Sequence, residues 1–259
     1  MLTLFTTCKP FEGLAGIHQY NALASWTKIV PLPEIIMLGN EPGAAEVADE
    51  LGLSRFYPIE RDSNGLPLVG PMFEQAQNVA QNDVVGYCNA DIVFVDGLIQ
   101  TTRRARKEFP NGFLLTGRRW DVSMDAPIDF ESDWRGQLRA KIEVKGDLYS
   151  PCGFDWFVFR RPLEWDIPDF VVGMPRWDNW MLWQAVQERT PIVTATFTAT
   201  AAHPRHGYGP EGDLKQQEWQ GSTRSEGNLR LAHGKVYCLR DVERAGLLWR
   251  VTPGGIVKV

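Results

Sequence analysis

The sequence has 259 residues, of which 44% are hydrophobic and 23% are charged, and its formal net charge at pH 7 is −5. These values are ordinary for a globular protein with a sizeable core. They give no basic footprint for sequence-independent nucleic-acid binding, and no apolar stretch approaches the length needed to span a membrane.

Strands and helices alternate along the first half of the chain. Short apolar runs predict strands at residues 2–6, 34–39, 56–57 and 84–88. Helical spacing predicts helices at residues 18–26, 44–51 and 71–80, the second ending at Gly52. This alternation predicts an α/β fold with a mainly parallel sheet and helices on both faces.

The second half is less regular. We predict strands at residues 113–117, 153–159 and 192–200, and helices at residues 134–142 and 177–189. The basic run at residues 103–107 is expected to be the solvated face of a helix. No internal repeat or interdomain linker is evident, so we expect one domain, residues 1–259.

The four cysteines are widely scattered, and no pair has metal-ligand spacing. They are Cys8, Cys88, Cys152 and Cys238. We therefore expect no disulfide framework and a reducing compartment. The chain reads as a strand directly from Met1, without a cleavage site, so we expect a cytoplasmic protein.

Two distant stretches look like the two halves of one metal site. Asn89-Ala90-Asp91 follows a predicted buried strand, and residues 203–206, His-Pro-Arg-His, follow a strand-like run. Open α/β sheets bind ligands at the carboxyl ends of their strands, and hard divalent cations take carboxylate and phosphate oxygens. We expect Asp91 and one of the histidines as ligands, His203 ahead of His206, with both histidines on a loop because of Pro204. An ordinary turn and structural histidines are the alternatives.

Several motifs occur in one order along the chain. They are residues 5–11 (FTTCKPF), 38–43 (LGNEPG), 89–92 (NADI), 117–121 (GRRWD), 153–159 (GFDWFVF), 177–180 (WDNW), 203–208 (HPRHGY) and 228–231 (NLRL). In this order the sequence resembles GT-A-fold, nucleotide-sugar-dependent glycosyltransferases of a family-two-like group. The similarity extends over most of the chain.

The resemblance implies a nucleotide-sugar-binding half, residues 1–121, and an acceptor-binding half, residues 122–259. It also implies a divalent metal, Mn²⁺ or Mg²⁺, which bridges the diphosphate of a nucleotide-sugar co-substrate. The implied cofactor-binding residues are Thr6, Lys9, Asn40, Glu41, Asn89, Asp91 and Arg118, and the implied metal ligands are Asp91, His203 and His206. Asn89 stands where the family has its first metal-binding carboxylate.

Inverting transfer to a hydroxyl group needs a general base. Asp155 and Asp178 are the candidates, and Asp155 is ranked first because burial among aromatic residues would raise its pKa. Asp178 has an alternative role as a cap in the first turn of a helix. A retaining enzyme would need no such base, and the sequence does not decide between the two outcomes.

The sequence thus predicts a metal-assisted glycosyltransferase that moves a sugar, from a UDP-sugar by preference, to a glycan or other hydroxyl acceptor. One alternative is glycosylation of a hydroxymethylated base in nucleic acid, which the acidic charge disfavours. Another is a non-catalytic relative that binds a nucleotide or a glycan. Nucleotidyl transfer ranks low because residues 1–17 contain no glycine-rich, basic phosphate loop.

Overall fold

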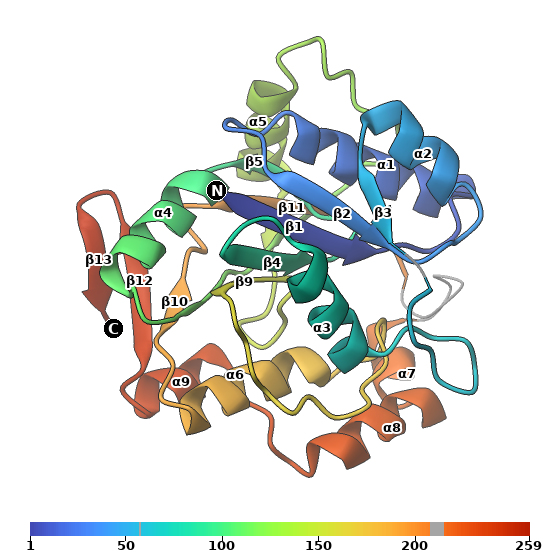
Figure 1. Ribbon diagram of the computed structural model, residues 1–259. Helices are drawn as coiled ribbons and strands as arrows, with labels where there is room; N and C mark the ends of the chain where they lie inside the picture. Colours follow the sequence, from blue (N-terminus) through green and yellow to red (C-terminus); the bar gives the residue numbers. More distant parts are fainter. Residues whose placement is uncertain (57, 208–214) are drawn as a thin grey trace.

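The computed structural model describes residues 1–56, 58–207 and 215–259. In this part of the chain the largest element is a nine-stranded sheet (Figure 1). Its order is β13 (Gly255–Lys258), β12 (Leu248–Thr252), β10 (Ile192–Thr194), β6 (Leu114–Thr116), β9 (Trp156–Arg160), β4 (Val84–Cys88), β1 (Leu2–Thr7), β2 (Glu34–Leu38) and β3 (Ser54–Phe56).

Most of this sheet is parallel. Strands β3, β2, β1 and β4 pair in parallel, as do β6, β10 and β12, whereas β9 is antiparallel to both β4 and β6. Strand β13 closes one edge as an antiparallel hairpin with β12. The predicted α/β class with a mainly parallel sheet is confirmed.

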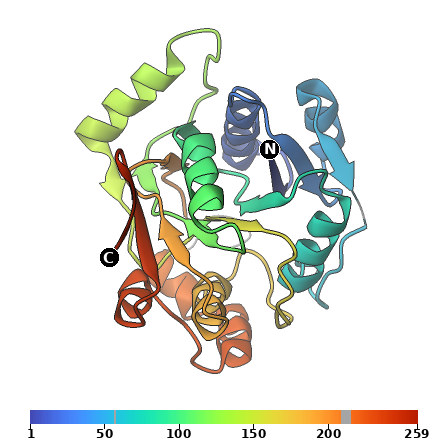
Figure 2. The same ribbon diagram turned by 60° about the vertical axis from the view of Figure 1, so that its left-hand side comes forward.

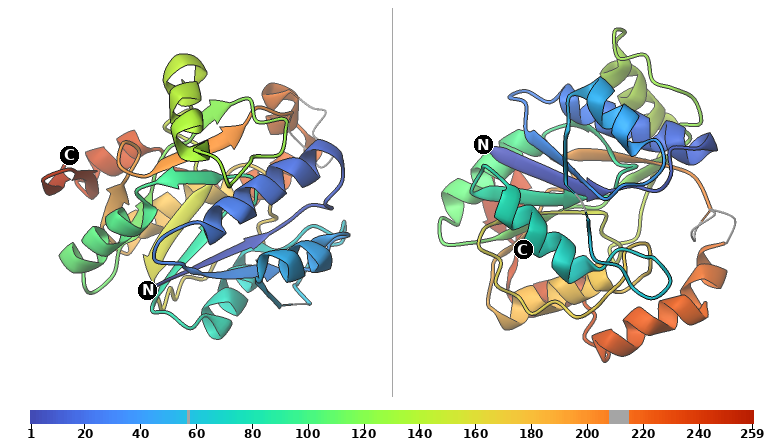
Figure 3. Two further views of the ribbon diagram at one scale, coloured as in Figure 1. Left: turned by 90° about the horizontal axis from the view of Figure 1, so that it is seen from above. Right: turned by 45° about the vertical axis from the view of Figure 1, so that its right-hand side comes forward.

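Helices cover both faces of the large sheet, because successive strand side chains point to opposite faces. On one face Leu4 packs with residues of α1 (Gly13–Thr27), α2 (Ala44–Leu51) and α4 (Leu98–Glu108). On the other face Phe5 packs with residues of α3 (Val69–Val79), α6 (Trp177–Gln187), α8 (Thr223–Ala232) and α9 (Leu239–Arg244). In Figure 1 and in the right-hand view of Figure 3, α1 and α2 lie above the sheet and α8 lies below it, with the short α7 (Gln216–Gln220) beside it.

A second sheet of four strands lies beside the first. Its order is β5 (Val93–Asp96), β11 (Thr200–Pro204), β7 (Trp120–Val122) and β8 (Asp147–Leu148). Helix α5 (Trp134–Lys145) packs on it through Trp134 and Leu138, and it stands on the opposite side of the molecule from α6 in Figures 1 and 2.

The turn between β5 and α4 lies tightly against the segment that leads into β11. Gly97 has a φ of +79°, and a Cβ atom there would lie 1.8 Å from the carbonyl oxygen of Thr198. Glycine both permits this backbone conformation and leaves room for the neighbouring chain. This contact lies where β11 joins the edge of β5.

Three of the predictions about local structure differ from the structure. Residues 192–200 form not one strand but β10 and the first residue of β11, which belong to different sheets. His203 lies in β11 rather than on a loop, and Pro204 is the last residue of that strand. Strand β3 begins at Ser54, and Tyr57, predicted as its end, lies outside the described residues.

The structure contains a disulfide, although no disulfide framework was expected from the sequence. Cys152 and Cys238 are bonded to each other although 86 positions separate them, and Cys8 and Cys88 are buried free thiols. The amide of Asn179 donates to the carbonyl oxygens of Cys152 and Tyr237, and so holds the two segments together. In the part of the chain that is described, no helix has the length and apolarity to cross a membrane.

Candidate functional site

Three parallel strands end at the same edge of the large sheet. Thr7 at the end of β1 pairs with Leu38 at the end of β2, and Phe5 pairs with Tyr87 near the end of β4. The predicted nucleotide-contact segments after these strands therefore share one edge. They are residues 6–9, 40–41 and 89–91.

The smaller sheet brings the late histidines to this edge. Strand β11 is antiparallel to β5 with Ala202 opposite Val93, two residues beyond Asp91. This pairing carries His203, the next residue of β11, toward Asp91. His206 follows two residues after the end of β11 and reaches the same carboxylate.

Asp91, His203 and His206 form one compact cluster. The Nε2 atoms of His203 and His206 lie 3.5 Å and 3.2 Å from Oδ2 of Asp91, and one ligand atom from each residue lies within 4.8 Å of the other two. The side chain of His203 is 6% exposed, whereas those of Asp91 and His206 are about one quarter exposed. The cluster is thus open on one side.

The carboxylate of Asp91 and the imidazole of His203 shift each other's pKa toward the charged form. Burial raises the pKa of Asp91, but His203 and His206 outweigh this effect and hold that pKa well below its usual range. Burial and the charge of Arg119 lower the pKa of His203, but Asp91 and Asp121 outweigh them and raise it. The other oxygen of Asp91, Oδ1, is buried and has no hydrogen-bond partner among the described residues.

This donor set fits a divalent cation. Ligand atoms about 2.1 Å from one ion are about 3.0–3.4 Å apart in octahedral or tetrahedral geometry, and the Nε2–Oδ2 distances to Asp91 are 3.2 Å and 3.5 Å. A buried acceptor without a donor is also unusual in a folded protein, and a cation would satisfy it.

A second group of polar side chains lies beside the cluster. Asn89 accepts a hydrogen bond from the Tyr87 hydroxyl at 2.6 Å and donates one to Oδ1 of Asp155 at 2.9 Å. Arg119 donates to the same Asp155 oxygen through Nη1 and to Oδ1 of Asp121 through Nε, the latter at 2.8 Å. Asn89 therefore uses both groups of its side chain within the protein.

The two candidate bases differ in their surroundings. Asp155 is buried and contacts the guanidinium of Arg119, so aromatic residues are not its only neighbours. Asp178, in the first turn of α6, accepts a hydrogen bond from the backbone N–H of Phe154 at 3.1 Å. Burial, with the nearby charge of Asp155, raises the pKa of Asp178 to about 6. Asp178 is thus a candidate base with a raised pKa.

Of the other residues predicted to contact the nucleotide-sugar, Lys9 follows β1, and Asn40 and Glu41 follow β2. Desolvation lowers the pKa of Lys9, and the charge of nearby Asp91 opposes this change; Glu41 pairs with Arg61 after the end of β2, and Asn40 is exposed beside it.

The side chains of Thr6 and Arg118 form hydrogen bonds within the protein. The Thr6 hydroxyl is fully buried and donates to the carbonyl oxygen of Thr7. The guanidinium of Arg118 donates to the carbonyl oxygens of Tyr149 and Leu148. Both side chains thus have structural hydrogen bonds.

Sequence reasoning did not single out His18. It is 4% exposed in α1, its ring stacks on that of His206 with centroids 5.7 Å apart, and its Nε2 lies 3.6 Å from Oδ1 of Asp125. Three of the four histidines in the sequence therefore lie together. The helical position of His18, far from both predicted motifs, gave no signal of this grouping.

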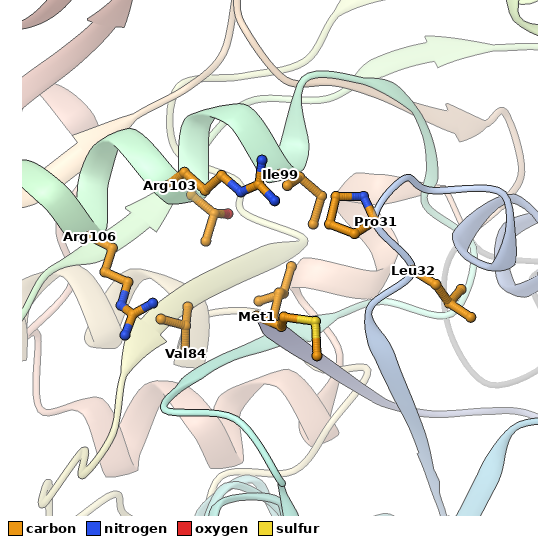
Figure 4. A pocket seen from close by; sticks show the side chains of 9 residues that line it. Met1, Pro31, Leu32, Val84, Ile99, Arg103 and Arg106 are labelled. Atoms are coloured by element: carbon orange, nitrogen blue, oxygen red, sulfur yellow. The ribbon is translucent and has the colours of Figure 1, made fainter.

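A small pocket occupies the opposite edge of the large sheet. It is lined by residues at or before the starts of β1, β2 and β4, including Met1, Leu32 and Val84, and by Arg103 and Arg106 of α4 (Figure 4). The dense basic run therefore lies at the amino ends of these strands, away from the cluster of Asp91.

Comparison with protein-family models and with curated proteins gave no match. Among solved structures, the chain is similar to M. tuberculosis glucosyl-3-phosphoglycerate synthase in complex with Mg²⁺ and UDP, with 10% identity over 91% of this chain and 79% of that one and a TM-score of 0.48. It is similar to the mannosyltransferase PcManGT from Pyrobaculum calidifontis in complex with GDP-Man and Mn²⁺, with 14% identity, coverage of 80% and 58%, and a TM-score of 0.47.

A third similarity is to S. aureus TarS 1-349, with 11% identity, a TM-score of 0.37, and coverage of 48% of this chain. That match spans only about a third, 36%, of the TarS chain. We therefore base the functional conclusion on the side chains of the site itself.

Proposed function

We propose that this protein is a metal-assisted glycosyltransferase that moves a sugar from a nucleoside diphosphate, a UDP-sugar by preference, to a hydroxyl acceptor. The observation that carries the proposal is the cluster of Asp91, His203 and His206 at the carboxyl edge of the large sheet, with a buried carboxylate oxygen that has no hydrogen-bond partner among the described residues. Ligands of open α/β sheets bind at this edge. The ordered motifs that resemble GT-A glycosyltransferases lead to the same reaction.

Each part of the site has a role in this reaction. Asp91, His203 and His206 would hold Mn²⁺ or Mg²⁺, which stabilises charge on the departing diphosphate as a Lewis acid. Lys9, close to Asp91, provides a cation for a phosphate group. We propose that Asn40 and Glu41, which follow β2 at the same edge, contact the base and ribose of the donor.

For an inverting reaction we propose Asp178 as the residue that takes the acceptor proton. Its pKa of about 6 leaves it mostly ionised at pH 7 and still basic enough to receive a proton. Asp155 would act differently, because its Oδ1 already accepts hydrogen bonds from Arg119 and Asn89. We propose that Asp155 orients the segment around Asn89.

A thermal-shift panel of nucleoside diphosphates and their sugars, with and without Mn²⁺, tests the proposal. A ligand at about 100 times its dissociation constant adds about 2.7 kcal/mol to the unfolding free energy, which raises the melting temperature by about 5–10 °C for a domain of this size. We expect a Mn²⁺-dependent shift with one nucleotide, and hydrolysis of its sugar conjugate in the absence of acceptor.

Two aspartates at opposite ends of β4 provide a matched pair of variants. Asp91→Asn should abolish both the Mn²⁺-dependent shift and the hydrolysis. Asp83→Asn removes the same charge immediately before β4, where Asp83 pairs with Arg106, and should leave both unchanged. Full activity of Asp91→Asn would refute the metal site, and the absence of a shift with every nucleotide would refute the donor site. A shift without hydrolysis or transfer would identify a binding protein instead.

A further inference from the structure

Strand pairing places Asp121 directly beside His203. Strands β7 and β11 are parallel, and Asp121 is the register partner of His203. Neighbours in adjacent strands have side chains on the same face. Oδ1 of Asp121 therefore lies 3.1 Å from Nδ1 of His203, on the side of the ring away from Asp91.

The two nitrogens of His203 have different tasks at a metal centre. A neutral imidazole has one N–H and one lone pair, so Nε2 can bind a cation only while the proton is on Nδ1. Nδ1 is buried, and no described residue forms a hydrogen bond of regular geometry with it. Asp121 is the carboxylate in contact with this nitrogen.

Arg119 fixes the carboxylate of Asp121. Its Nε donates to Oδ1 of Asp121 at 2.8 Å, its Nη1 donates to Asp155, and its guanidinium lies 3.9 Å from the ring centroid of Tyr149. The Arg119 side chain is only 6% exposed. The carboxylate of Asp121 is therefore tied to a buried cation rather than free to turn toward solvent.

We propose that Asp121 is a positioning residue that keeps the proton of His203 on Nδ1 and thereby presents Nε2 to the cation. The inference rests on the proposed metal site. Asp121 is not itself a member of the ligand cluster, because its Oδ1 faces Arg119 and Nδ1 of His203. Carboxylates that accept the second N–H of a ligating histidine typically change metal affinity 10- to 100-fold when they are replaced.

The first test uses the ion-free wild-type protein and therefore does not depend on metal binding. Protein labelled with ¹⁵N-histidine is studied by NMR at a pH where the imidazole rings are neutral, and His203→Gln identifies the His203 signals. We expect the proton of His203 on Nδ1. A proton on Nε2 in wild type would overturn the proposal even if Mn²⁺ binds normally.

The second test measures Mn²⁺ affinity by calorimetry for wild type, Asp121→Asn and Asp147→Asn. Asp147 is the register partner of Asp121 on the other side, in β8, and it pairs with Arg205 at the surface, so its variant removes the same charge nearby. We expect Asp121→Asn to weaken Mn²⁺ binding about 10- to 100-fold and to reduce the preference of the His203 proton for Nδ1, because an amide oxygen accepts a hydrogen bond more weakly than a carboxylate. Asp147→Asn should change neither.

The outcomes separate the two proposals. Equal Mn²⁺ affinity in wild type and Asp121→Asn, or an equal loss in both variants, would overturn the role of Asp121. A folded wild type that binds no Mn²⁺ would refute the proposed metal site, while the NMR measurement would still decide where Asp121 holds the His203 proton.

Discussion

Removal of the Cys152–Cys238 disulfide should lower the stability of the protein substantially. The bond joins the loop before β9 to the start of α9, and 86 positions separate its two cysteines. In the chain-entropy model, a cross-link stabilises by restricting the unfolded chain, with an entropy of −2.1 − 1.5R ln n cal/mol/K for a closed loop of n residues. For this loop the model gives about 4.6 kcal/mol at 25 °C.

This free energy corresponds to a large change in melting temperature. One kcal/mol shifts the midpoint by about 2–4 °C for domains of 150–250 residues, so the loss should lie between about 9 and 18 °C. The measurement is calorimetry of wild type and of Cys152→Ser/Cys238→Ser, each with and without reductant. Serine is a favourable residue at position 238, the N-cap of α9, so the variant keeps a capping side chain.

We expect reductant to lower the midpoint of wild type to that of the double variant and to leave the double variant unchanged. Cys8 and Cys88 remain in both proteins as buried thiols, and they control for other effects of reductant. Equal midpoints of the two proteins without reductant, with the wild-type mass showing an intact disulfide, would refute the entropic reasoning.

Three further predictions concern other features of the fold. Gly97→Ala and Gly65→Ala change two glycines with the same φ of +79°, but a Cβ at Gly97 would lie 1.8 Å from the Thr198 oxygen, whereas one at Gly65 would meet nothing within 4 Å. In urea unfolding we expect Gly97→Ala to lose more than about 3 kcal/mol of stability and Gly65→Ala about 1 kcal/mol. Equal losses in the two variants would contradict the steric argument. Burial raises the pKa of Asp178 to about 6, so its contribution to stability is full below the unfolded pKa near 3.8 and is lost as pH rises through 6. The unfolding free energy of Asp178→Asn, relative to that of wild type, should therefore increase by up to about 3 kcal/mol between pH 4 and pH 8. A stability difference between variant and wild type that is the same at pH 4 and pH 8 would show that a raised pKa of Asp178 is not its cause. Arg119→Met leaves two carboxylates without their shared cation and should cost about 3–5 kcal/mol in urea unfolding, whereas a loss below about 1 kcal/mol would show that solvent replaces the guanidinium.

The strands of the first half were predictable because their signals are local. The short apolar runs at residues 34–39 and 84–88 were predicted as strands, and the structure has strands at Glu34–Leu38 and Val84–Cys88. The parallel arrangement follows from the alternation with helices. The positions of Asp91 and the predicted nucleotide-contact segments at one edge are consequences of that arrangement.

The rest of the site depends on contacts between distant residues, which a single sequence does not reveal. The proposed role of Asp121 comes from its register with His203 in the three-residue strand β7, which we did not predict as a strand from the sequence. His18 joins His206 from a helix near the start of the chain. The cysteine pair was missed for the same reason, because scattered spacing contains no information on which segments fold together.

The antiparallel direction of β9 links the packing of the core to the alignment of the site. Trp156 is the register partner of Cys88, so the strand begins where β4 ends, and the carbonyl oxygen of Asp155 accepts a hydrogen bond from the N–H of Asn89. Trp156 and Phe157 pack into the cores on opposite faces of the sheet. A shift of β9 by one residue would exchange these faces and would also move Asp155 away from Asn89. Fully buried aromatic residues of β9 therefore set the spacing of the polar groups at the edge of the sheet.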